Sequence, residues 1–112
     1  MFSVGVDIIE ISRFKNANYL NRVAEFFLTP EELREALNSS DKYQHLASRF
    51  AAKEAVIKAI PEPSNYMDFE IVKQDKKPVV KFLRPELTKY KVALSLSHSE
   101  GSAIAFAAAQ TI

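Results

Sequence analysis

The chain has 112 residues, the size of one typical domain, and we expect residues 1–112 to form a single domain. Its net charge of +1 at pH 7 gives no support for a nucleic-acid or membrane partner. The sequence contains no cysteine, which excludes disulfides and thiolate metal sites. It has neither a signal-peptide pattern nor the apolar run of roughly 20 residues that spans a membrane, so we expect a cytoplasmic protein.

The predicted elements place helices mainly in the first half of the chain and strands mainly in the second. In chain order they are a strand over residues 2–9, short helices over 10–15 and 19–27, a helix over 30–37, a long helix over 42–59, strands over 69–74, 79–82 and 92–97, and a final segment over 102–110. Thr29, Pro30 and two following acids form a strong helix start. The final segment could be a strand or a helix, but pairing across residues 98–101 favours a strand. We expect an α+β fold with helices packed on an antiparallel sheet.

The long helix carries an acid where its pattern predicts an apolar face. At about 100° per residue, Glu54 falls within the arc that also holds Leu46, Phe50 and Ala51. Lys58 follows one turn later on the same arc. An unpaired buried charge is costly, so Glu54 is either paired with Lys58 or bound to a metal. For Glu54 alone, the ion pair with Lys58 is the better explanation.

Asp7 is a second acid in apolar surroundings. It lies on the strand face that it shares with Gly5, a residue that allows a backbone or a ligand to approach closely. Asp7 alone supports a cap of the following helix as well as it supports a functional site. Together, Asp7 and Glu54 favour a site for a hard cation, because Mg²⁺ is held by one or two carboxylates plus substrate phosphates. The spacing of these two acids in the sequence is not itself a signal for metal binding.

Cations and hydroxyls elsewhere in the sequence could bind a phosphate. Arg49, Lys53 and Lys58 place positive charge on the long helix, although such residues commonly form a solvated face. Lys58 fits that explanation poorly because it shares the apolar arc, and a phosphate partner would account for it. His98 and Ser99 follow a strand at a turn, where hydroxyls, an imidazole and amides can bind phosphate. A turn histidine bonded to the backbone is a slightly better explanation of His98, and a Ser-His hydrolase is weakly supported because no nucleophile elbow is present.

Three segments of the sequence occur in an informative order. They are Gly5–Ile11, Arg49–Ala55 with the nearby Lys58, and Ser95–Ser99. Together they resemble holo-[acyl-carrier-protein] synthase, the short type of 4′-phosphopantetheinyl transferase, over nearly the whole chain. The resemblance implies transfer of phosphopantetheine from coenzyme A to a serine of acyl carrier protein, with release of 3′,5′-ADP, in fatty acid biosynthesis. It also implies a homotrimer with active sites at subunit interfaces.

The resemblance further implies a role for each site residue. Asp7 and Glu54 would hold Mg²⁺ on the pyrophosphate of coenzyme A, and Glu54 and Lys58 would serve catalysis. The contacts to its phosphates would come from Arg49, Lys58, His98 and Ser99. Arg13 would meet the acidic carrier protein. The general base would be Glu54 or a metal-bound water.

The segment after the long helix departs from the family's pattern. The family usually has a glycine-containing loop there, whereas residues 60–66 hold two prolines and no glycine. We therefore expect a shorter and stiffer loop with altered contacts near coenzyme A. This departure keeps open a catalytically weak or silent module of the same fold that binds carrier protein or a nucleotide. Hydrolysis of a small pyrophosphate at the same metal site is a third alternative.

Overall fold

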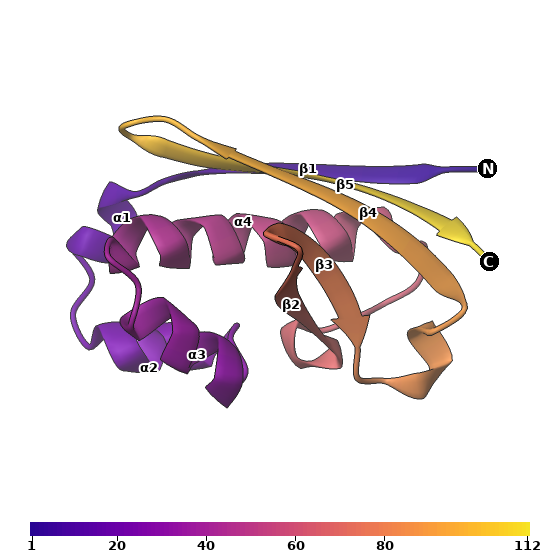
Figure 1. The fold of residues 1–112 in the computed structure, drawn as a ribbon, viewed down its shortest axis with the longest axis horizontal. Helices are drawn as coiled ribbons and strands as arrows, with labels where there is room; N and C mark the ends of the chain where they lie inside the picture. The colour runs from indigo at the N-terminus through magenta and orange to yellow at the C-terminus, as the bar shows by residue number, and fades with distance from the viewer.

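The long helix α4 (Lys42–Ala59) packs against one face of a three-stranded antiparallel sheet in the computed structural model, which describes residues 1–112 (Figure 1). The strand order is β1 (Ser3–Glu10), β5 (Ser102–Thr111) and β4 (Tyr90–His98). The remaining elements are α1 (Ser12–Lys15), α2 (Leu20–Glu25), α3 (Pro30–Leu37), the hairpin of β2 (Phe69–Gln74) and β3 (Lys77–Phe82), and the short 3₁₀ helices η1 (Tyr66–Asp68) and η2 (Pro85–Leu87). The short helices α1 to α3 cluster near the N-terminal end of α4, and the hairpin follows further along it (Figure 1). The predicted α+β class is confirmed.

The starts of α3 and α4 are those that the sequence predicts, whereas the short helix expected from residue 10 begins at Ser12 because β1 continues to Glu10. Thr29 and Glu32 form a capping box at α3, in which Thr29 Oγ1 accepts a hydrogen bond from the Glu32 amide and Glu32 Oε1 accepts one from the Thr29 amide. Asp41 caps α4 by accepting a hydrogen bond from the Gln44 amide at 3.1 Å. The predicted bounds of α4 match, and the final segment of the chain is a strand, as predicted.

The turn of the β2–β3 hairpin is shorter than predicted. Asp75 and Lys76 alone make the turn, with φ angles of 52° and 67°, so β3 begins two residues earlier, at Lys77. A two-residue turn with positive φ at both positions matches the twist of antiparallel strands. Pro78 therefore lies inside β3. Proline cannot donate a backbone hydrogen bond, but β3 is an edge strand, where the missing donor is tolerated.

Helix α4 is buried over more of its surface than the sequence pattern indicated. The side chain of Lys53 is fully buried and Arg49 is 4% exposed, so these residues are not a solvated face. Lys58 is instead 52% exposed at its side chain, and its predicted place on the buried arc is wrong. Glu54 is half-buried, so its exposure is intermediate between that of Lys53 and that of Lys58. Neither α4 nor any shorter helix combines the length and apolar character that a bilayer crossing requires.

Strand β1 crosses α4 at backbone distance because of Gly5. A Cβ atom placed on Gly5 would lie 2.1 Å from the carbonyl oxygen of Ala55 and 2.8 Å from Cβ of Lys58. The neighbouring strand β5 presents buried alanines on the same face: Ala103, Ala105, Ala107 and Ala109. Small side chains on both strands therefore bring the sheet and the helix close together.

Gly5→Ala is expected to lower the free energy of unfolding by about 1–3 kcal/mol, because the added methyl group would overlap a helix carbonyl. Urea denaturation of the purified variant measures this loss. Gly101→Ala is the matched control, since a Cβ atom there meets nothing within 4 Å. Equal stability of the two variants would contradict the close packing of β1 on α4.

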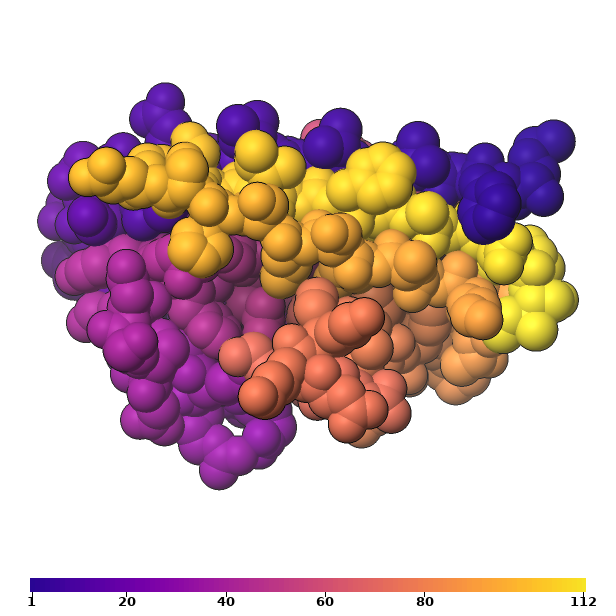
Figure 2. Space-filling view, turned by 45° about the horizontal axis from the view of Figure 1, so that its top comes forward, coloured from indigo at the N-terminus to yellow at the C-terminus, as the bar shows by residue number.

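The face of the sheet that points away from α4 is apolar and exposed; we call it the outer sheet face. Its side chains are Phe2, Val4, Val6, Ile8, Ile104 and Phe106, which are between 40% and 67% exposed. Val6 pairs with Phe106 and Ile8 with Ile104 across β1 and β5, so the side chains form one continuous patch. Figure 2 shows β1, β5 and β4 side by side along the upper part of the molecule. A contiguous apolar patch of this kind is typical of an interaction surface.

Candidate active site

Strand β1 and helix α4 bring Asp7 and Glu54 to one place. Lys58 Nζ lies 3.2 Å from Asp7 Oδ1 and donates a hydrogen bond to the carbonyl oxygen of Val6 at 3.1 Å. Glu54 precedes Lys58 by one helical turn, and Tyr66 donates a hydrogen bond to Glu54 Oε1. The charges of Glu54 and Asp7 both raise the pKa of the Tyr66 phenol, so both carboxylates lie near it.

Tyr66, beside these carboxylates, is a site residue that the sequence did not single out. Burial raises the pKa of its phenol to about 12, together with the hydrogen bond and charge of Glu54 and the charge of Asp7. The phenol therefore stays protonated at neutral pH and donates its hydrogen bond to Glu54. The only sequence signal for this role was an aromatic residue with a hydroxyl group in the loop after α4.

The oxygens of this pair fit a divalent hard cation. Asp7 Oδ2 and Glu54 Oε2 make no hydrogen bond in the structure, so each carboxylate has one oxygen available. No group of three or more acidic, histidine or cysteine side chains surrounds them. Mg²⁺ typically takes one or two protein carboxylates and fills its remaining positions with water and substrate phosphates. Asp7 and Glu54 therefore suit a metal site that a phosphate ligand completes.

A second set of polar side chains lines a hollow between α4 and the β2–β3 hairpin, beneath β4. The hollow has a volume of about 350 Å³ and is visible between the helices and the hairpin in Figure 2. Its polar lining consists of Gln44, His45, Ser48, Arg49, Lys73, Lys76 and His98. Arg49 contributes a guanidinium to this lining, and its Nη2 is buried 3.5 Å from Glu35 Oε1. We call this region the cationic hollow; its charge and donors suit a phosphate.

Two lysines of the cationic hollow were missed by sequence reasoning. Lys73 lies near the end of β2 and Lys76 lies in the left-handed turn after it, so the tight hairpin carries both to the hollow. His45 lies here too, 3.9 Å from Glu35 Oε1. The register of the hairpin could not be predicted from residue types, and without it neither lysine could be placed beside Arg49.

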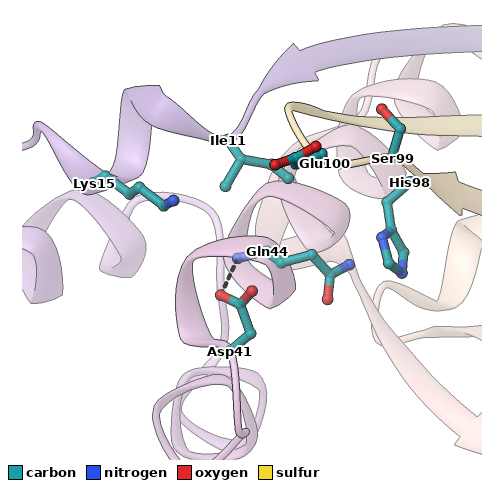
Figure 3. Close-up of a pocket in the computed structure, with 7 residues that line it drawn as sticks. All are labelled: Ile11, Lys15, Asp41, Gln44, His98, Ser99 and Glu100. Atoms are coloured by element: carbon teal, nitrogen blue, oxygen red, sulfur yellow. Dashed lines mark hydrogen bonds between the residues drawn. The ribbon is translucent and has the colours of Figure 1, made fainter.

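His98 also borders a broader, open hollow of about 660 Å³ (Figure 3). In Figure 3, His98, Ser99 and Glu100 reach it from the β4–β5 turn, Lys15 faces it from α1, and Asp41 and Gln44 lie at the start of α4. Ser99 thus lines this broader hollow and not the cationic one. The carboxylates of Asp41 and Glu100 make it less suited to a phosphate than the cationic hollow.

One chain does not bring all predicted site residues together. Arg49 and Glu54 are separated by about 140° around the axis of α4, from the usual 100° per residue. Accordingly, Asp7, Glu54 and Lys58 line no part of the hollow that holds Arg49 and His98. Arg13 is exposed on α1 and is not among the residues that line the cationic hollow. The structure therefore contains an acidic group at β1 and α4 and a separate cationic group at α4 and the hairpin.

His45 is expected to make stability depend on pH between 6.5 and 4. Burial, followed by the charge of Arg49, lowers its pKa from 6.5 to about 4. Within this window the unfolded chain binds a proton that the folded chain does not, so stability is fully present above pH 6.5 and falls as pH decreases. We expect His45 to account for a loss of about 1–2 kcal/mol, after allowance for solvent screening. Urea unfolding at pH 7 and pH 4 measures it.

The variant His45→Gln should remove this contribution to the pH dependence. His98→Gln is the matched control because His98 is exposed at the end of β4. An unchanged pH dependence in His45→Gln would contradict the assignment to His45.

The sequence of the chain matches a known protein family and individual proteins of that family. The sequence model of the 4′-phosphopantetheinyl transferase superfamily matches residues 3–108. The chain belongs to this superfamily. The holo-[acyl-carrier-protein] synthase of Chlamydia caviae is 40% identical to this superfamily member over 113 aligned positions, which cover 93% of each chain. The resemblance of its three sequence segments is thus confirmed, and the protein is an enzyme of the transferase class.

Solved structures of the superfamily have the same fold. The holo-[acyl-carrier-protein] synthase of Neisseria meningitidis superposes with a TM-score of 0.85 at 30% identity, covering 97% of this chain and 98% of that one. The synthase of Bacillus anthracis in complex with CoA (3′,5′-ADP) superposes with a TM-score of 0.84 at 31% identity, covering 98% and 96% of the two chains. The likeness extends over almost the full length of this superfamily member.

Proposed function

We propose that the chain is a holo-[acyl-carrier-protein] synthase, formed by residues 1–112 as one transferase domain. It would transfer 4′-phosphopantetheine from coenzyme A to a serine of apo acyl carrier protein, a step of fatty acid biosynthesis. The observation that carries this proposal is the placement of Asp7 beside Glu54 and Lys58 by the contact of β1 with α4. Relatives that bear this name, one of them solved with coenzyme A, support it.

The reaction exchanges one phosphorus–oxygen bond for another. The serine oxygen forms a bond to the phosphorus that carries pantetheine, and the bond from that phosphorus to the bridging oxygen breaks, so 3′,5′-ADP leaves with the electron pair. The serine proton passes to Glu54 or to water. Mg²⁺ held by Asp7 and Glu54 would polarise the phosphorus and neutralise the pyrophosphate. Lys58, exposed beside Asp7, adds a cation at the same place.

The remaining phosphate contacts would come from the cationic hollow of a second protomer. Arg49 and His98 lie on a different side of α4 from Glu54, so one coenzyme A molecule would reach both groups only across a subunit boundary. The outer sheet face offers an apolar surface for contact between copies. We therefore propose a homotrimer with shared sites, as the family resemblance implies. Arg13 on α1 would meet the acidic carrier protein, and the cytoplasmic location stays a prediction.

The proposal is tested by the mass of the carrier protein. Incubation with apo acyl carrier protein, coenzyme A and Mg²⁺ should add one phosphopantetheine to the carrier, and chelation of Mg²⁺ should prevent the gain. Intact-mass spectrometry measures both results. No gain, beside a working synthase as positive control, would overturn the proposal and favour the silent binding module. Release of hydrolysed coenzyme A without a gain on the carrier would favour the pyrophosphate hydrolase.

The shared site predicts that two inactive variants restore activity together. Glu54→Gln disables the acidic group and Arg49→Gln disables the cationic hollow, so trimers with both kinds of protomer contain some intact sites. Mixing after subunit exchange should therefore recover part of the wild-type transfer rate. Glu54→Gln mixed with Asp7→Asn is the control, since both changes lie in the same group. No recovery in mixed trimers seen by native mass spectrometry would contradict a shared site.

A further inference from the structure

Tyr66 is held at both ends by two consecutive residues of α4. Its phenol donates a hydrogen bond to Glu54 Oε1, and its backbone carbonyl accepts one from Lys53 Nζ at 2.6 Å. Lys53 is itself fixed, because its fully buried ammonium also donates to the Phe69 carbonyl at 2.7 Å and lies 2.9 Å from Glu32 Oε1. The position of the phenol relative to Glu54 is therefore set by the helix that carries Glu54.

The ring and the backbone of Tyr66 are also restrained by their neighbours. The ring lies 6.4 Å from that of Phe27 and 6.3 Å from that of Phe50, between centroids. The short helix η1 is closed by Asp68, which accepts a hydrogen bond from the Asn65 amide at 2.8 Å. A phenol restrained in this way cannot move away from Glu54 without displacing the packing around it.

The hydrogen bond from Tyr66 occupies one of the two oxygens of Glu54. Oε1 accepts the hydrogen bond from the phenol, whereas Oε2 makes no hydrogen bond and is the oxygen available to a ligand. We propose that Tyr66 is a positioning residue that keeps Glu54 a one-oxygen ligand and thereby favours Mg²⁺ over Ca²⁺ at the acidic group. This inference rests on the proposed function, because it assumes the metal site at Asp7 and Glu54.

The two cations differ in what they require from a carboxylate. Mg²⁺ has near-octahedral geometry with ligands at about 2.0–2.1 Å and keeps several waters, so one oxygen from each of two carboxylates suits it. Ca²⁺ takes about 6–8 oxygens at about 2.3–2.6 Å and commonly binds a carboxylate through both oxygens. While Tyr66 donates to Oε1, a cation that bound both oxygens of Glu54 would have to share Oε1 with the phenol hydrogen, which disfavours the two-oxygen contact. Removal of the phenol hydroxyl would free Oε1 and allow the larger cation a two-oxygen contact.

The test compares cation affinities of Tyr66→Phe and wild type without turnover. Protein with coenzyme A but no carrier protein is titrated with Mn²⁺, followed by electron paramagnetic resonance, and Mg²⁺ or Ca²⁺ is then added as competitor. Tyr90→Phe is the matched control, because Tyr90 donates an equivalent hydrogen bond to Glu62 Oε2 at 2.6 Å. We expect Tyr66→Phe to bind Mg²⁺ about tenfold or more weakly, with Ca²⁺ binding unchanged or tighter. Tyr90→Phe should keep the wild-type ratio of the two affinities.

The possible outcomes separate this inference from the proposed function. An unchanged ratio of Mg²⁺ to Ca²⁺ affinity in Tyr66→Phe would overturn the role of Tyr66 and leave the metal site standing. Equal weakening for both cations would also overturn it, because a merely structural role would loosen the site without changing its preference. Failure of the wild type itself to bind Mn²⁺ with coenzyme A would overturn the metal site and the inference with it.

Discussion

Glu54→Gln is expected to lower the transfer rate about 1000-fold or more while leaving the fold intact. Glutamine has the same size as glutamate, and its carbonyl oxygen can still accept the hydrogen bond of Tyr66. It lacks the negative charge, however, so a cation on the pyrophosphate would lose one of its two carboxylate ligands. Intact-mass measurement of carrier modification over time gives the rate, and urea unfolding shows that the fold is retained.

The matched control is Glu86→Gln, which changes an acid that is 67% exposed at its side chain on η2. It should transfer at the wild-type rate. Asp7→Asn should behave like Glu54→Gln, although it also leaves Lys58 without its carboxylate partner at 3.2 Å. Retained turnover in both Asp7→Asn and Glu54→Gln would rule out the metal roles assigned to these residues.

Lys53→Met is expected to lower the free energy of unfolding by about 3–5 kcal/mol, because it breaks a buried ion pair by removing one partner. Glu32, only 3% exposed at its side chain, would be left without the ammonium that lies 2.9 Å away. Two backbone carbonyls, those of Tyr66 and Phe69, would lose their buried donor at the same time. Urea denaturation of the variant measures the change.

Lys42→Met provides the control for Lys53→Met, since Lys42 is an exposed lysine at the start of the same helix. Its stability should stay within about 0.5 kcal/mol of wild type. The double variant with Glu32→Met should recover part of the loss, because it removes the unpaired charge, although the Ile71 amide then loses its acceptor at 2.7 Å. If Lys53→Met and Lys42→Met were equally stable, the buried pair would contribute nothing.

Local signals in the sequence predicted the elements, because they act within a few residues. The Thr29 capping box and the Asp41 cap mark the starts of α3 and α4, and both are found as predicted. The burial of Lys53 could not be predicted from such local signals. Its burial depends on Glu32 from α3 and on carbonyls after α4, all of which reach it through the tertiary fold.

The candidate site was predictable only where residue type alone was informative. Acids in apolar surroundings singled out Asp7 and Glu54, and the structure places them together. Tyr66 was not predicted because its role depends on the path of the loop back to α4. That loop, the glycine-poor segment 60–66, is held at Glu62, which accepts a hydrogen bond from Tyr90 and lies 3.0 Å from Lys89 Nζ. The stiffness expected from its prolines and its effect on coenzyme A both stay predictions.

The small residues between β1, β5 and α4 limit which substitutions the protein can accept during evolution. Gly5 and its cross-strand partner Ala107 are both buried, and no ligand is expected to touch them. A larger residue at either position would move α4 away from the sheet, and Glu54 would move away from Asp7 with it. Substitutions at these two buried positions can therefore change the catalytic rate. A mutational scan should find Gly5 and Ala107 as intolerant of substitution as the site residues themselves.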